Sequence, residues 1–199
     1  MLYTSIYIQI ISCNILIKLI KYQITFNHIF MIITLEEFPR IKEKELKGKK
    51  ISCTSGYYDP IHPGHVSCIM ESKKFGDILV VIVDGDSRCI NKKGKPFIPA
   101  VDRADIVDAI KGVDYVIIHE NPKATNCAEV LEVVRPDVFC KGGDRNDSDR
   151  NNPNSGLKVE ADLVESYGGH IEYGVGKDKI WSSSNYLQEW VDFVNNRKD

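Results

Sequence analysis

The sequence predicts an α/β protein built on a doubly wound, five-stranded parallel sheet. From Lys50 onward, short runs rich in β-branched residues alternate with longer amphipathic runs, and turn residues separate each pair. Such alternation is typical of βα repetition. The short runs, among them ILVVIV, YVII and VFC, are continuously apolar, which is typical of parallel strands that helices cover on both faces.

Five strands and five helices are expected along the chain. The strands are expected at residues 50–54, 78–83, 115–119, 138–140 and 170–173. The helices are expected at residues 64–74, 101–110, 126–134, 157–167 and 183–195. Polar motifs follow the first, second and fourth strands, so we expect one ligand site beyond the carboxyl ends of the strands. The polar run RNDSDRNNPNSG, residues 145–156, has no periodicity and is expected to be a mobile loop over this site.

The composition predicts one soluble domain with a small-molecule partner. The chain has 199 residues, of which 43% are hydrophobic and 27% are charged, and this suits a single core. Its formal net charge is -2, so we expect neither a nucleic acid nor a membrane surface as partner. The six cysteines form no CxxC pair, which argues against a zinc ribbon and favours buried thiols in a reducing cytoplasm.

The first residues differ from the rest of the chain, and we expect residues 1–40 to be an extension of a domain at 41–199. No Gly, Pro, Ala, Asp or Glu occurs before Glu36, and polar residues interrupt the apolar run before the ~20 residues of a membrane span. Three interpretations stay open: a membrane or targeting segment, a poorly ordered extension, or upstream sequence ahead of a true start at Met31.

The stretch TSGYYDPIHPGH, residues 54–65, predicts a phosphate cradle. Gly56 permits a tight backbone turn, while Pro63 and Gly64 suit the start of a helix. A helix start attracts phosphate through its dipole and its free N–H groups, and the imidazoles of His62 and His65 can add hydrogen bonds. The residues alone leave two alternatives open, namely ordinary capping or core histidines and a pair of zinc ligands.

This stretch resembles the GxFDxxHxGH signature of the cytidylyltransferase-like nucleotidyltransferase superfamily. The matching positions are Gly56, Tyr58, Asp59, His62, Gly64 and His65. Three further segments resemble family segments in the same order. They are VDGDSRCINKKGKPFIPAVDR, RPDVFCKGGDR at residues 135–145 and WSSSNYL at residues 181–187. The second is similar to a segment of heptose 1-phosphate adenylyltransferases, while the general signature is shared with glycerol-3-phosphate cytidylyltransferases.

The resemblance implies a Rossmann-like nucleotidyltransferase fold and transfer of AMP or CMP from a nucleoside triphosphate to a phosphorylated sugar or polyol. Pyrophosphate is the leaving group, and no protein nucleophile is required. Mg²⁺ is implied as a companion of the triphosphate, without dedicated protein ligands. The resemblance also implies a homodimer, and the alternative is a catalytically inactive nucleotide-binding or regulatory protein of the same fold.

The resemblance also assigns roles to residues. The expected catalytic residues are His62, His65 and Lys93. The expected nucleotide-binding residues are Tyr57, Tyr58, Gly64, Lys141, Gly142, Gly143, Asp144, Ser182, Ser183 and Ser184. The expected substrate-binding residues are Asp84, Arg103 and Arg145, and Asp59 is expected to support the turn.

Plainer interpretations of these segments stay open. From the residues alone, the lysines at 92, 93 and 95 suit a solvated basic loop, the two glycines a turn, and the serines a helix N-cap. The chain also departs from the family pattern, since Ile180 and Trp181 replace smaller residues before the serines and Arg145 follows KGGD.

Overall fold

The computed structural model describes residues 31–143, 145–153, 155–178 and 180–197. The chain divides into two units, Met1–Met31 and Ile32–Asp199, and the fold below is that of the second. The three interpretations of the first thirty residues therefore lie outside the described residues.

The second unit is built on a six-stranded sheet in which every neighbouring pair is parallel. The strands are β1 (Ile32–Ile33), β2 (Ile51–Gly56), β3 (Ile78–Asp84), β4 (Tyr115–His119), β5 (Val138–Cys140) and β6 (His170–Glu172). The five predicted strands are confirmed, and β1 adds a sixth at the edge beside β4. Because β1 is only two residues long, it carries no periodicity that a sequence pattern could reveal.

The helices alternate with the strands as expected, with three additions. They are α2 (Phe38–Glu45), α3 (Pro63–Ser72), α4 (Asp86–Lys93), α5 (Ala100–Asp108), α6 (Ala128–Val134), α7 (Asp147–Asn151), α8 (Gly156–Ser166) and α9 (Ser183–Asn196), with a 3₁₀ turn at Lys73–Phe75. The sequence did not predict α2, α4 or α7. Helix α4 includes Lys92 and Lys93, which the plainer interpretation had placed in a solvated basic loop. Helix α7 lies inside the run that was expected to be a mobile loop. Only Arg88 and Cys89 are buried in α4, so it lacks the apolar stripe that marks a helix in sequence.

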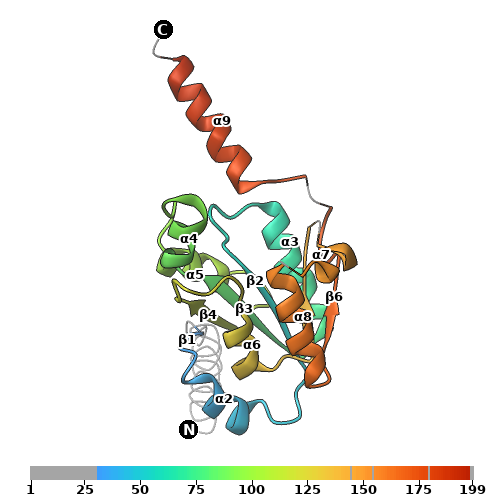
Figure 1. The fold of residues 1–199 in the computed structure, drawn as a ribbon. Coiled ribbons are helices and arrows are strands. Elements are labelled where there is room, and N and C mark those ends of the chain that lie inside the picture. The colour runs from blue at the N-terminus through green and yellow to red at the C-terminus, as the bar shows by residue number, and fades with distance from the viewer. Residues whose placement is uncertain (1–30, 144, 154, 179, 198–199) are drawn as a thin grey trace, which may run out of the picture. The chain divides into compact units, whose positions relative to one another are not determined.

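Helices cover both faces of the sheet, α3 and α5 on one and α6 and α8 on the other (Figure 1). Leu79, Val81 and Val83 of β3 pack in one cluster with Ile69 of α3 and Val107 of α5. The alternate residues of the same strand point to the opposite face and are also fully buried. Burial on both faces is why the strand is apolar throughout rather than alternating.

The strand order reverses at β2, which lies between β3 on one side and β5 on the other. The chain runs from β2 outward to β3 and β4, and later returns to the other side of β2 with β5 and β6. Ligands of doubly wound sheets bind at this switch point, outside the carboxyl ends of the strands. The loops that follow Gly56 and Cys140 therefore frame the expected site.

Helix α9 extends away from the body of the unit (Figure 1), and none of its residues is buried. Its first turn is attached to the site, because the Ser183 hydroxyl donates to the Pro60 carbonyl at 2.8 Å. None of the helices among the described residues has the length and apolar character needed to cross a bilayer.

Candidate active site

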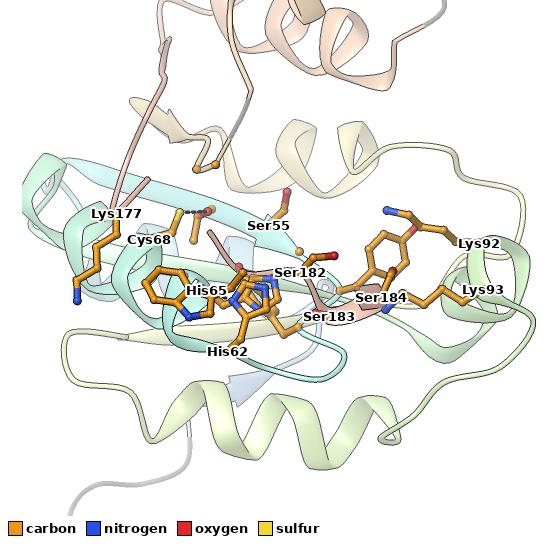
Figure 2. A pocket seen from close by; sticks show the side chains of 18 residues that line it. Ser55, His62, His65, Cys68, Lys92, Lys93, Lys177, Ser182, Ser183 and Ser184 are labelled. Carbon is orange, nitrogen blue, oxygen red and sulfur yellow. Dashed lines mark hydrogen bonds between the residues drawn. The ribbon is translucent and has the colours of Figure 1, made fainter. Parts of the chain in front are cut away.

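A cavity of about 330 Å³ lies at the switch point. Loops and helix ends from distant parts of the sequence line it: the loop after β2, the start of α3, the end of α4, the loop after β5 and the start of α9 (Figure 2). The predicted residues that line it are Tyr57, Tyr58, His62, Gly64, His65, Lys93, Gly142, Gly143, Ser182, Ser183 and Ser184. The structure thus brings together most of the residues that the sequence assigned to catalysis and nucleotide binding.

The two histidines form a unit at the start of α3. His62 is the N-cap of the helix, and its Nδ1 accepts a hydrogen bond from the His65 backbone N–H at 3.3 Å. The two rings stack with centroids 3.6 Å apart. A Cβ at Gly64 would lie 3.1 Å from the His62 ring and 3.2 Å from Trp181, so the glycine keeps space for both rings. His62 therefore caps α3 and also lines the cavity that could hold a phosphate, so the two interpretations of this histidine are compatible.

Both imidazoles are neutral at neutral pH. Burial lowers the pKa of His62 from its ordinary value. Burial also lowers the pKa of His65 to about 3, and the neighbouring His62 and Lys93 add to this effect. His65 Nδ1 is buried without a hydrogen-bond partner among the described residues. The pair thus offers neutral imidazole N–H groups, each of which can donate a hydrogen bond to a phosphate oxygen.

Asp59, which was expected to support the turn, holds the lysine side of the cavity. Its carboxylate is fully buried and accepts hydrogen bonds from the backbone N–H groups of Phe97 and Ile98 at 2.9 to 3.1 Å. The Lys93 ammonium donates to the Asp59 carbonyl oxygen at 2.5 Å and lies 3.7 Å from the carboxylate. Lys92 lies over the Tyr57 ring, 4.3 Å from its centroid. Two ammonium groups are therefore held at one wall.

A second helix, α9, also begins at this cavity. The Ser182 hydroxyl caps α9 by accepting a hydrogen bond from the Asn185 N–H at 3.4 Å, which confirms the N-cap interpretation of the serines. The positive ends of two helix dipoles, those of α3 and α9, thus lie at one cavity. Such ends bind phosphate and other anions.

The charge of this cavity has one sign in the described structure. Its described lining contains three lysines, Lys92, Lys93 and Lys177, and no Asp or Glu. The described residues also contain no cluster of three or more His, Cys, Asp or Glu side chains that could hold a metal ion. Within the described part of the chain, the histidine pair therefore has none of the further ligands that a zinc site needs. A ligand with several negative charges fits this lining.

A second cavity of about 490 Å³ adjoins the first and receives the other predicted residues. Asp84, Lys141 and Arg145 line it. Lys141 therefore lies outside the first cavity and forms an ion pair with Glu160 at 2.7 Å.

Arg103 lines neither cavity. Its side chain is fully buried and donates to the carbonyl oxygens of Tyr57, Asp84 and Ile98 and to the Asp86 carboxylate. Arg103 therefore holds the loops after β2 and β3 together. The remaining predicted residue, Asp144, lies outside the described residues.

Several residues of the first cavity received no catalytic or binding role from the sequence: Thr54, Ser55, Gly56, Cys68, Lys92, Lys177 and Trp181. Cys68 faces the cavity from α3, one helical turn beyond His65. Lys177 follows the carboxyl end of β6, and this position at the strand ends is the signal that could have revealed it. Trp181 differs from the smaller residue of the family pattern, and nothing further in the sequence indicated that it lines the cavity.

Comparison with known proteins identifies the family of this chain. The model of the cytidylyltransferase-like family matches residues 53–187. The bifunctional protein HldE of Desulfatibacillum aliphaticivorans is 36% identical over 127 residues, which are 63% of this chain and 24% of that protein. HldE of Geobacter metallireducens is 35% identical over 134 residues, or 66% of this chain and 25% of that protein. The match thus spans about a quarter of the length of these relatives.

A solved structure shares the fold. It is pantoate-beta-alanine ligase from Francisella tularensis, complexed with beta-gamma ATP and beta-alanine. The TM-score is 0.55 at 15% sequence identity, and the match covers 79% of this chain and 72% of that chain.

Proposed function

This chain belongs to the cytidylyltransferase-like family, and on that premise we propose that it is a nucleotidyltransferase. It transfers AMP or CMP from a nucleoside triphosphate to a phosphorylated sugar or polyol and releases pyrophosphate. The observation that supports this is the first cavity, where two neutral histidines, three lysines and two helix starts meet and no described carboxylate intrudes. The KGGD motif at residues 141–144, which resembles a segment of heptose 1-phosphate adenylyltransferases, favours ATP as the donor.

The proposed reaction is a direct displacement at the α-phosphorus. A phosphate oxygen of the acceptor forms a bond to the α-phosphorus, and the bond from that phosphorus to the bridging oxygen of the β-phosphate breaks. The electron pair of this bond leaves with pyrophosphate. Because no protein nucleophile takes part, catalysis depends on alignment and on neutralising the negative charge that moves between the phosphates.

The residues of the cavity have separate roles in this scheme. His62 and His65 donate hydrogen bonds to the α-phosphate as it becomes five-coordinate. Lys93, which Asp59 holds in place, lies beside the charge that moves from acceptor to leaving group. Ser183 and Ser184 bind the outer phosphates at the start of α9, where the N–H groups of a helix start are free to donate.

The magnesium ion of the scheme arrives with the triphosphate. The described lining of the first cavity holds no carboxylate, so phosphate oxygens and water would supply its ligands. When bound, it neutralises part of the triphosphate charge. We also propose that the chain forms a homodimer and acts in the cytoplasm, with the triphosphate and the phosphorylated acceptor as its small-molecule partners.

The test is a matrix of nucleoside triphosphates against phosphorylated sugars and alcohols, read by pyrophosphate release with Mg²⁺ present. Heptose 1-phosphate with ATP and glycerol 3-phosphate with CTP are the first pairs to try. We expect release with a sugar or polyol phosphate, and loss of that release in His65→Ala. If no pair releases pyrophosphate although the chain binds a triphosphate in calorimetry, the chain is an inactive nucleotide-binding protein and the proposal fails.

A further inference from the structure

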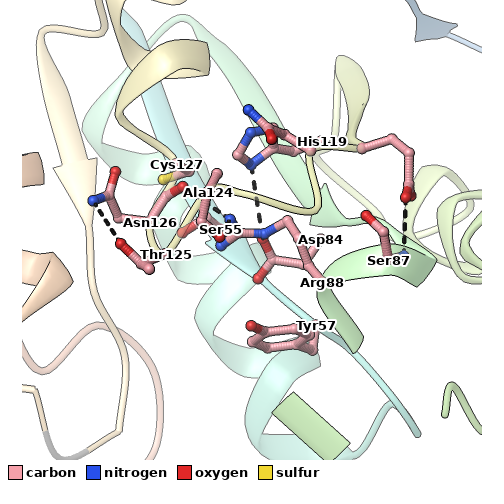
Figure 3. A network of polar contacts seen from close by, with 12 residues as sticks. Ser55, Tyr57, Asp84, Ser87, Arg88, His119, Ala124, Thr125, Asn126 and Cys127 are labelled. Atoms are coloured by element: carbon pink, nitrogen blue, oxygen red, sulfur yellow. Dashed lines mark hydrogen bonds and ion pairs between the residues drawn. The ribbon is translucent and has the colours of Figure 1, made fainter. Parts of the chain in front are cut away.

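A buried histidine, His119, lies at the carboxyl end of β4 and takes no part in the proposed reaction. It is paired in register with Asp84, the last residue of β3, and its carbonyl oxygen accepts a hydrogen bond from the Gly85 N–H at 2.9 Å. Only 2% of its side chain is exposed. Asp84 lines the second cavity, so the imidazole lies next to a wall of that cavity without lining it (Figure 3).

One nitrogen of the ring is bonded to a carboxylate. His119 Nε2 lies 2.5 Å from Oε1 of Glu129 on α6, and the Asn121 amide donates to the other carboxylate oxygen at 2.6 Å. Burial alone would raise the pKa of Glu129, but the hydrogen bonds from Asn121 and His119 leave that pKa lowered. Glu129 is thus ionised at neutral pH and can only accept, so Nε2 of the ring carries a hydrogen.

The other ring nitrogen, Nδ1, is buried and has no hydrogen-bond partner in the part of the chain that the structure describes. It lies 4.0 Å from Asp84 Oδ1. In the neutral ring, whose hydrogen is on Nε2, Nδ1 is an acceptor that faces a carboxylate oxygen, and neither atom can donate to the other. A protonated ring carries a hydrogen on Nδ1 as well, and it can donate to Asp84 once the two atoms approach by about 1 Å.

The charges around the ring also favour proton uptake. Asp84 of β3, Arg88 of α4 and Glu129 of α6 form one ion-pair cluster with the ring, while the Glu120 carboxylate beside His119 bonds the start of α4 instead. Two carboxylates and one guanidinium leave one negative charge unbalanced, and a protonated ring balances it. Histidine is the side chain whose charge ordinarily changes between pH 5 and 8. The cluster is therefore built to respond to pH in this range.

The Asp84 carboxylate connects the ring to the loop between β4 and α6. Arg88 Nε donates to Asp84 Oδ1 at 2.6 Å, and both side chains are almost fully buried (Figure 3). The same guanidinium donates to the carbonyl oxygens of Ala124 and Asn126 at 2.6 and 3.0 Å. Asp84, Arg88 and Asn126 all line the second cavity. A movement of Asp84 toward His119 therefore acts, through Arg88, on the wall of this cavity.

We propose that His119 is a positioning residue that acts by taking up a proton: the protonated ring bridges Glu129 and Asp84 and, through Arg88, fixes the wall of the second cavity. The proton binds Nδ1 from solvent at low pH and returns to solvent at high pH, and no other covalent bond changes. This inference rests on the proposed function, because its kinetic consequence is a pH dependence of that reaction. The acceptor KM is the expected readout, since Asp84 is one of the expected substrate-binding residues.

Nuclear magnetic resonance of the full chain tests the proton itself and needs no turnover. The imidazole signals of His119, identified by their loss in His119→Phe, should titrate between pH 5 and 8 with Nε2 protonated throughout. In Glu129→Gln the midpoint should fall by about one pH unit or more, because the carboxylate that favours the charged ring is gone. The Glu129 side chain is 46% exposed, so this variant keeps the fold, and thermal melting checks both variants. A ring that does not titrate, or an unchanged midpoint in Glu129→Gln, would overturn the proposal.

Steady-state kinetics test the positioning role. The ratio of the acceptor KM at pH 8 to that at pH 6 should be about threefold or more larger in the wild type than in His119→Phe, in line with loss of one hydrogen bond between charged groups. The kcat ratio of the two chains should stay within twofold, because the ring touches neither cavity. His170→Phe is the matched control, since His170 is an exposed histidine outside both cavities, and its KM ratio should equal that of the wild type.

Hydrogen exchange separates failure of this inference from failure of the proposed function. The amides of residues 120–127 should exchange more slowly in the wild type than in His119→Phe at pH 6, and equally in the two chains at pH 8, because only the protonated ring holds this loop. This pattern without pyrophosphate release from any substrate pair would keep the positioning role and reject the proposed function. Equal exchange at both pH values, or equal KM ratios in a chain that does release pyrophosphate, would overturn the positioning role.

Discussion

The imidazole rings of His62 and His65 stack face to face, with centroids 3.6 Å apart and an interplanar angle of 14°. Two protonated rings at this separation would repel each other, and burial further disfavours the charged form. The positive charge of the first cavity therefore comes from its lysines and its helix starts, while the histidines supply neutral hydrogen bonds. This arrangement leads to a prediction about pH.

The free energy of unfolding should fall as the pH is lowered from 6.5 toward 3, in part because of His65. Its pKa in the folded chain is about 3, below the ordinary value of 6.5, so the unfolded chain binds the proton first. His65 therefore contributes stability that is fully present above pH 6.5 and is lost as the pH falls through this window, at up to about 1.4 kcal/mol per pH unit. Urea unfolding at pH 7, 6, 5 and 4 measures the slope.

The comparison that isolates His65 is the variant His65→Gln, which cannot take up a proton at this position. We expect a shallower loss of stability with falling pH in this variant than in the wild type. His170→Gln serves as the control, because the His170 side chain is exposed on β6 outside both cavities. Parallel slopes for the wild type and His65→Gln would contradict the prediction.

Substitution of His65 should affect turnover more than binding. In the proposed reaction the imidazole contacts the α-phosphate most strongly as it becomes five-coordinate, so it stabilises the transition state more than the bound substrate. His65→Ala should reduce kcat by about 10² to 10³ and change the triphosphate KM by only a few-fold. Initial rates of pyrophosphate release test this, with His170→Ala as control. Turnover within a few-fold of wild type would remove His65 from the reaction.

Much of the fold was predictable because strands that are buried on both faces appear in the sequence as continuous apolar runs. Parallel strands such as β4 and β5 are mostly apolar because helices cover both their faces, and both begin and end at the predicted residues. Helix α4 was not predictable in the same way. Its sequence DSRCINKK has no apolar stripe, and it is held by the buried Arg88 and ended by Gly94, which has a positive φ of 88°.

The candidate site was predictable in its motif and less so in its individual contacts. The sequence places His62, His65 and Ser183 after the strand ends, and topology then brings them to one cavity. A sequence cannot distinguish an arginine that contacts substrate from one that binds backbone carbonyls, as Arg103 does. Nor can it indicate that the Lys141 side chain pairs with Glu160, because Lys141 lies in the loop after β5 and Glu160 lies on α8, nineteen residues further on.

Asp59→Asn should destabilise the folded chain and displace the segment at residues 97–98. The buried carboxylate accepts two backbone hydrogen bonds there and lies beside Lys93. An amide keeps one acceptor oxygen but loses the charge, which leaves the Lys93 ammonium without its counter-charge. We expect a loss of roughly 2 to 4 kcal/mol in the free energy of unfolding. Urea denaturation measures it, with Asp178→Asn as an exposed control, and a loss below 0.5 kcal/mol would contradict this role.

The Lys141–Glu160 pair should show strong coupling in a double-mutant cycle. Both side chains are largely buried, with 13% of Lys141 and 8% of Glu160 exposed, so Lys141→Met alone leaves an unpaired carboxylate and Glu160→Gln alone leaves an unpaired ammonium. Each single substitution should cost roughly 3 to 5 kcal/mol, while the double variant should cost much less than their sum, because it leaves no buried charge. Urea denaturation of the wild type, the two single variants and the double variant gives the coupling energy.

The exposed pair Lys158 and Asp162, 2.6 Å apart on α8, provides the control cycle. Its coupling energy should stay below about 1 kcal/mol. Equal coupling in the two cycles would show that burial does not strengthen the first pair.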